Sequence, residues 1–206
     1  MNKVLDFYRL LIEGACHPNK DYPKNFTLED GSYILWNCKD LLNDAIRDWN
    51  MPEENNYVSE KAYNLWKEIA EPTENINSYW DSKHFKCAKD NVKLDVYKGG
   101  SNEPDHQATY SKGEKIRFND IFTVEHIIPV KVLYDELLKT YTDNGNKISD
   151  EEIVTILNKM CIARVTKYED KHLDHRFKRE NTFEKVYKTT YSDVDLLDYK
   201  FDKVKR

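Results

Sequence analysis

The segment FNDIFTVEHIIPVKVLYDEL, residues 118–137, sets an acid beside an imidazole at the end of an apolar run. Glu125 and His126 follow the sequence IFTV and precede IIP. Adjacent residues of a β-strand point to opposite faces, so one member of the pair would face whatever the strand packs on. Burying such groups is unfavourable unless the protein uses them. The pattern therefore indicates a functional pair.

These residue types suit phosphodiester hydrolysis. A neutral imidazole, whose ordinary pKa is about 6.5, can take a proton from an attacking water. A carboxylate can hold a divalent cation that binds the scissile phosphate. On one strand, His126 could face the water while Glu125 faces the cation. Pro129 would stop strand pairing, so we expect the pair at an edge open to substrate.

The order of elements around this pair resembles the ββα-metal, or HNH, nuclease motif. In that family an Asp-His or His-His pair ends the first strand, commonly within DHI(I/V)P, and VEHIIPV at 124–130 is similar to it. NKMCIARVT at 158–166 resembles the lead into the second strand, and TKYEDKHL at 166–173 would form the helix. The resemblance spans residues 118–175, and we expect a nuclease core at about 118–178 with a helical insertion between its two strands.

The resemblance implies two catalytic residues and, separately, one metal ligand. His126 would be the general base, Asn158 would brace the loop of the site, and Glu125 would bind the metal. The family's usual Asn or His on the helix is missing, because Lys171 stands near its place and lysine does not bind this kind of metal.

Three residues near Lys171 are alternatives for the second metal ligand: Glu169, Asp170 and His172. We favour Glu169 and His172, because residues three apart share a helix face. A capping box with Thr166 explains Glu169 equally well.

The expected activity is that of a metal-dependent endonuclease, a restriction or other defence enzyme of bacterial or phage origin. Its cofactor would be one divalent ion, Mg²⁺ or alternatively Mn²⁺, and its partner double-stranded DNA, which Lys167, Lys171 and Arg176 would contact. A homodimer would match a palindromic target. Two alternatives remain open: a non-catalytic nucleic-acid-binding or interaction module with a degenerate motif, and an RNase toxin of the same class.

The remaining patterns predict an α+β fold with a helical N-terminal half. Residues 1–80 form the helical region, with a role in target recognition or dimerisation, and residues 81–206 form a strand-containing region. Apolar residues at helical spacing predict helices within 4–14, 31–49, 59–71, 130–141, 149–160 and 166–177, and a final helix within 191–206. Alternating and β-branched stretches predict strands within 91–128 and at 161–166.

Composition limits the other classes of protein. A net charge of −5 argues against non-specific coating of nucleic acid, although the basic segments 82–93, 112–117 and 175–180 could bind it locally. Four cysteines without CxxC spacing are expected to be free, with Cys16-His17 and His84/Cys87 as an alternative zinc set. No apolar run reaches the roughly 18 residues of a membrane span, and the charged N-terminus does not resemble a secretory signal. We therefore expect a cytoplasmic protein without a membrane partner.

Overall fold

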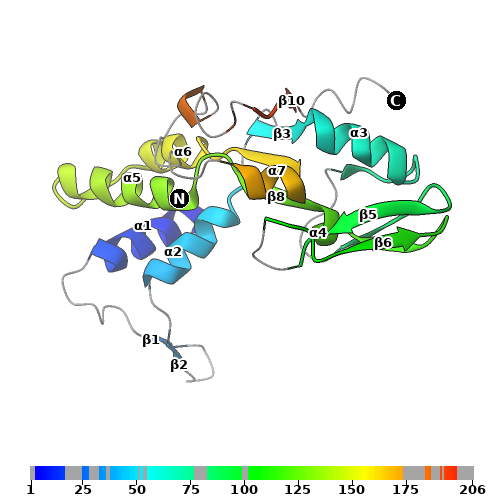
Figure 1. The fold of residues 1–206 in the computed structure, drawn as a ribbon. Helices are drawn as coiled ribbons and strands as arrows, with labels where there is room; N and C mark the ends of the chain where they lie inside the picture. The colour runs from blue at the N-terminus through cyan, green and yellow to red at the C-terminus, as the bar shows by residue number, and fades with distance from the viewer. Residues whose placement is uncertain are drawn as a thin grey trace. The chain divides into compact units, whose positions relative to one another are not determined.

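The computed structural model of the chain describes residues 3–16, 25–27, 33–35, 38–50, 52, 55–76, 83–98, 102–173, 184–186, 191 and 193–198. These residues form helices and β-strands, which confirms the predicted α+β class (Figure 1). The chain divides into two compact units. The first contains Met1–Pro52, Ile128–Met160 and Arg179–Phe183; the second contains Glu53–Ile127, Cys161–Lys178 and Glu184–Arg206. Neither unit coincides with the expected regions 1–80 and 81–206.

The first unit is mainly helical. It contains α1 (Lys3–Cys16), α2 (Cys38–Arg47), α5 (Val130–Asp143), α6 (Asp150–Leu157) and the antiparallel strands β1 (Asn25–Thr27) and β2 (Tyr33–Leu35). Helix α1 packs on α2 and α5, and α5 packs on α6. The side chains facing inward are fully buried, because each helix has an apolar stripe at helical spacing. They include Leu11, Ile12, Leu42, Ile46, Leu133, Leu137, Ile153 and Leu157.

Helices α5 and α6 confirm that the segment between the two predicted strands of the core has helices of its own. Ser149 caps α6 in a capping box with Glu152, as the sequence predicted. The helix predicted from residue 31 is wrong at its start, because Tyr33–Leu35 pairs with Asn25–Thr27 and α2 begins only at Cys38. The pattern Tyr-Ile-Leu suits a strand once a pairing partner is present.

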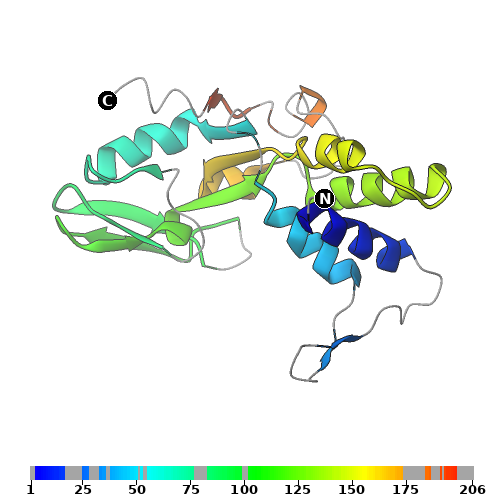
Figure 2. The same cartoon turned by 180° about the vertical axis from the view of Figure 1, so that it is seen from behind.

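The second unit contains a four-stranded sheet in the order β10-β3-β9-β8, of which β8 (green) and β9 (gold) lie side by side in Figure 2. Its strands are β3 (Asn56–Ser59), β8 (Phe122–His126), β9 (Ile162–Thr166) and β10 (Leu196–Asp198). Strand β9 pairs antiparallel with β8 and parallel with β3, and β10 pairs antiparallel with β3. Helix α7 (Lys167–His172) follows β9 directly and contacts both β8 and β9. The described sheet therefore ends at β8, which confirms that the acid–imidazole pair lies on an edge strand.

The rest of the second unit surrounds one hydrophobic core. Helix α3 (Glu60–Ile69) begins at the Ser59 cap, α4 (Phe118–Ile121) is a single turn, β4 (His84–Lys86) pairs with β7 (Lys115–Arg117), and β5 (Val92–Val96) pairs with β6 (His106–Tyr110). The ring centroids of Trp66 and Phe85 are 4.6 Å apart, and those of Phe118 and Phe122 are 5.3 Å apart. These aromatic contacts join α3, β4, α4 and β8 in one core.

Two other predictions of elements need correction. The helix predicted within 191–206 is wrong at Leu196–Asp198, which forms β10 because its backbone satisfies the free edge of β3. The strand pattern predicted through residue 121 is interrupted by α4, whose Phe118 and Ile121 turn inward to the core. No sequence pattern predicted β3, since four residues give too short an alternation.

Two predictions from composition have structural counterparts. The four cysteines are free, and three of them are buried: Cys38, Cys87 and Cys161. None of the helices in the described ranges is long and apolar enough to cross a membrane.

Candidate active site

Glu125 and His126 are the last two residues of β8, and both are half-buried. Glu125 pairs with Ala163 and His126 with Ile162 of β9. The strand pleat therefore directs the two side chains to opposite faces of the sheet. Pro129 is the N-cap of α5, and Ile127 still donates its backbone N–H to the Cys161 carbonyl at 2.8 Å. Strand pairing thus ends just before the proline.

The face that carries His126 is the face toward the hydrophobic core of the second unit. Val58 and Phe122 lie on it by the same alternation, and both pack in the aromatic core. Arg164 also lies on this face and is 1% exposed, with its Nη1 donating to Asn56 Oδ1 at 3.4 Å. Sequence reasoning missed this buried arginine, because the sequence of β9 does not show which of its polar side chains the fold buries.

The face that carries Glu125 is covered by α7. Ser59 of β3 lies on this face, since Tyr57 pairs with Ala163 and Ser59 is two residues further along the strand. The Ser59 hydroxyl donates to Glu169 Oε2 of α7 at 2.7 Å. This bond ties α7 to the face of the sheet from which Glu125 projects.

The Glu169 carboxylate stabilises the fold through hydrogen bonds. Its Oε2 accepts hydrogen bonds from the Thr166 backbone N–H at 2.8 Å and from the Thr166 hydroxyl at 2.9 Å, in addition to that from Ser59. The side chain is 5% exposed. These contacts form the predicted capping box, which is confirmed, and they account for the burial of the carboxylate without a metal.

We expect Glu169→Ala to destabilise the protein by about 3 kcal/mol or more, because three buried donors lose their acceptor. Chemical denaturation followed by circular dichroism measures this loss. The matched control is Glu152→Ala, which removes the same capping box from the exposed end of α6. A smaller loss is expected there, and equal losses would contradict the structural role assigned to Glu169.

Asp170, the next residue of α7, is half-buried. Both Asp170 and Glu125 act electrostatically on one residue, Tyr191. Tyr191 is fully buried, and its hydroxyl has no hydrogen-bond partner among the residues that the structure describes. Burial raises the pKa of this hydroxyl well above its usual range. The carboxylates of Glu125 and Asp170 raise that pKa further, as does Cys161. Both acids therefore act on the pKa of one buried phenol.

Sequence reasoning had named Asp170 but favoured its neighbours. The signal that could have separated them was present: a capping box uses the carboxylate of Glu169 itself. Tyr191 gave no signal, because it is 66 residues from Glu125 in the chain and belongs to no motif. Only long-range folding brings it to the site.

The other predicted residues of the helix have different surroundings. His172 is exposed, stacks on the Tyr168 ring with centroids 4.2 Å apart, and has its Nδ1 2.7 Å from the Tyr168 carbonyl oxygen. Lys167 and Lys171 are half-buried. Arg176, predicted to contact nucleic acid, and His175 lie outside the described residues.

Asn158 belongs to the first unit and is the C-cap of α6. Its Oδ1 accepts a hydrogen bond from Trp49 Nε1 at 3.0 Å, which ties the end of α6 to the segment after α2. The C-cap position and this bond give Asn158 a bracing contact within its own unit. A catalytic contribution from Asn158 stays a prediction.

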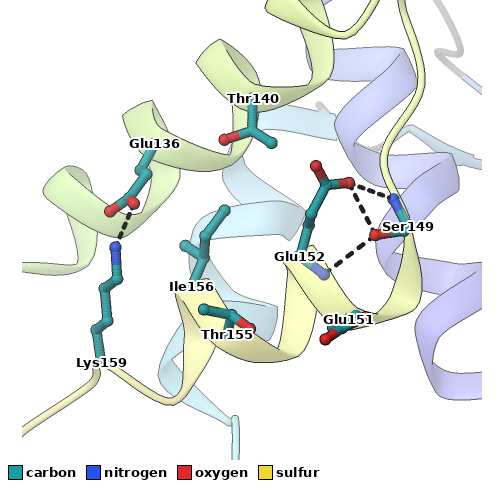
Figure 3. Close-up of a pocket in the computed structure, with 8 residues that line it drawn as sticks. All are labelled: Glu136, Thr140, Ser149, Glu151, Glu152, Thr155, Ile156 and Lys159. Carbon is teal, nitrogen blue, oxygen red and sulfur yellow. Dashed lines mark hydrogen bonds and ion pairs between the residues drawn. The ribbon is translucent and has the colours of Figure 1, made fainter.

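The first unit also has a surface hollow of about 510 Å³ between α5 and α6 (Figure 3). Two of its three acidic side chains have structural partners: Glu152 caps α6 through Ser149, and Glu136 pairs with Lys159. The remaining lining residues carry no nucleophile paired with a base: Thr140, Glu151, Thr155 and Ile156. The hollow does not resemble an active site.

Glu125 and Asp170 carry the kind of donor that a hard divalent cation prefers. Mg²⁺ is commonly held by one or two carboxylates, with water and substrate phosphate as its other ligands. The described residues contain no cluster of three or more His, Cys, Asp or Glu side chains. They do contain Glu125 on β8 and Asp170 on the helix that contacts β8, and these two carboxylates would supply oxygen ligands to such a cation. This donor set is unsuited to zinc, which prefers nitrogen and sulfur.

Comparison of the chain with protein-family models, with curated proteins and with solved structures gives no match.

Proposed function

We propose that the protein is a metal-dependent endonuclease that hydrolyses phosphodiester bonds of double-stranded DNA. The observation that carries the proposal is the position of Glu125 at the end of β8, on the face of the sheet covered by the helix α7 that carries Asp170, with His126 next to Glu125 in the chain. An antiparallel strand pair followed directly by a helix is also the order of elements in ββα-metal nucleases, which the EHIIP sequence resembles.

Under this proposal Glu125 and Asp170 hold the cation. Asp170 is preferred to Glu169, because the Glu169 carboxylate already accepts three hydrogen bonds. It is preferred to His172, because imidazole nitrogen is a poorer ligand than carboxylate oxygen for Mg²⁺. When bound, the cation neutralises charge on the phosphate and on the departing oxygen.

His126 supplies the proton transfer. One ring nitrogen of its neutral imidazole takes a proton from water as the water oxygen forms a bond to phosphorus. The bond between phosphorus and the 3′ oxygen breaks, and this oxygen leaves with the electron pair and is then protonated. His126 is half-buried at the end of the edge strand β8, on the face opposite to Glu125, so the proposal requires the substrate phosphate to lie beyond the strand end, where it would meet both side chains.

The direct test incubates purified protein with supercoiled plasmid DNA, and separately with RNA, in Mg²⁺ or in EDTA. We expect DNA cleavage in Mg²⁺ and none in EDTA, with discrete fragments if the enzyme is a sequence-specific restriction or defence enzyme. Sequencing of the fragment ends then gives the cut position. The control is an equal amount of His126→Ala protein from the same purification, which excludes a contaminating nuclease.

Two other outcomes decide against the proposal. Cleavage of RNA with intact DNA would assign the protein to the RNase class that the same residues permit. Intact DNA and RNA under all conditions, together with binding of either polymer, would identify a non-catalytic nucleic-acid-binding module.

A further inference from the structure

The strand pair β4–β7 combines two basic segments that are about thirty residues apart in the sequence. His84 of β4 lies opposite Arg117 of β7, and Lys86 lies opposite Lys115. All four side chains are exposed, whereas Phe85 and Ile116 between them are buried in the aromatic core. We call the four exposed residues the basic strand face.

The basic strand face brings like charges close together. Residues two apart on a strand are roughly 6.6 Å apart, and neighbouring strands are about 4.8 Å apart. Like charges directly opposite each other on a strand pair are destabilising. Lys86 and Lys115 occupy such a pair, so the arrangement costs stability in the protein alone. A feature that is unfavourable for folding is better explained by a ligand.

No described acidic side chain neutralises this face. None of the four residues forms an ion pair with any residue of the described ranges. Two described carboxylates near this strand pair accept hydrogen bonds from backbone groups. Glu74 accepts from the Lys86 N–H at 3.3 Å, and Glu114 accepts from the Ser111 N–H at 2.9 Å. Within the described ranges the three cations and the imidazole therefore have no acidic side-chain partner, in a chain whose net charge is −5.

We propose that the basic strand face binds the phosphate backbone of double-stranded DNA, a role that rests on the proposed nuclease function. A row of fixed cations matches a polymer with a charge at every nucleotide. The face lacks the large exposed apolar side chains that anchor proteins in a membrane surface; among described residues those belong to α1 and α7. An anionic polymer in solution is therefore favoured over an anionic membrane.

The test measures the affinity for a short fluorescent duplex by anisotropy, in EDTA so that no cleavage occurs, over a series of salt concentrations. We compare the wild type with Lys86→Gln/Lys115→Gln. The loss of two phosphate contacts should lower the slope of log affinity against log salt concentration by about 2, with affinity roughly tenfold weaker or more. The control is Lys139→Gln/Lys147→Gln, two exposed lysines of the first unit, which removes the same charge.

Melting temperature provides a check on the fold, since neutralising opposed lysines should leave it unchanged or raise it. Equal slopes for the wild type and both variants would overturn the inference, as would a wild type that binds no DNA. If the wild type bound anionic vesicles but no DNA, and Lys86→Gln/Lys115→Gln lost the vesicle binding, the face would be assigned to a membrane instead. A reduced slope in a protein that never cleaves DNA would support this face and refute only the nuclease function.

Discussion

The His126→Ala variant should cleave DNA about 10²- to 10⁴-fold more slowly than the wild type, which is the usual contribution of a general base. The side chain is half-buried at the end of an edge strand, so its removal should leave the sheet intact. Single-turnover cleavage of a defined duplex in Mg²⁺, with enzyme in excess, measures the chemical step.

The matched control for this variant is His106→Ala, at an exposed position on β6. It removes the same side chain from the same unit and should cleave at the wild-type rate. His126→Ala should also keep the cation affinity of the wild type, because the imidazole is assigned to proton transfer. Cleavage at the wild-type rate by His126→Ala would remove the general base from the account, whatever the metal does.

The second large effect concerns the cation. Glu125→Gln and Asp170→Asn should each weaken Mg²⁺ or Mn²⁺ binding by at least about tenfold, because a ligand charge is lost in each case. Calorimetric titration without nucleic acid measures this directly. In the wild type, a cation concentration of one hundred times the dissociation constant should stabilise the fold by about 2.7 kcal/mol, and both variants should lose about half of that increment or more at the same concentration.

Glu169→Gln is the control that separates the two neighbouring acids of α7. This variant should bind the cation like the wild type and be less stable without it, because the capping box is weakened. Asp170→Asn should show the opposite behaviour, with unchanged or higher metal-free stability, since one of two like charges near Tyr191 is removed. If Glu169→Gln lost the cation and Asp170→Asn kept it, the assignment of the second ligand would be reversed.

Local signals allowed much of the fold to be predicted from the sequence. The capping boxes at Ser149 and Thr166 and the Ser59 cap fixed the starts of α6, α7 and α3, because these motifs involve only residues three apart. Strands β8 and β9 were visible from their β-branched content. Strands β3 and β10 were not, since their hydrogen bonds run to partners far away in the sequence.

The candidate site could be predicted only in part for the same reason. The adjacent acid and imidazole at Glu125 and His126 are a local feature and were visible in the sequence. The helix that carries Glu169 and Asp170 was visible as well. The choice between Glu169 and Asp170 depended on Ser59, which reaches Glu169 only after β3 has paired with β9. The buried Tyr191 and the joining of β4 to β7 likewise required tertiary contacts that no short motif encodes.

The most direct measurement is a crystal structure of the protein with Mn²⁺, recorded at a wavelength where manganese scatters anomalously. The account predicts one anomalous peak in the second unit, within bonding distance of a carboxylate oxygen of Glu125 and of Asp170, with the Tyr191 hydroxyl bonded to an oxygen near it. A peak bound by other residues, or no peak while these two carboxylates bond only to protein groups, would contradict it.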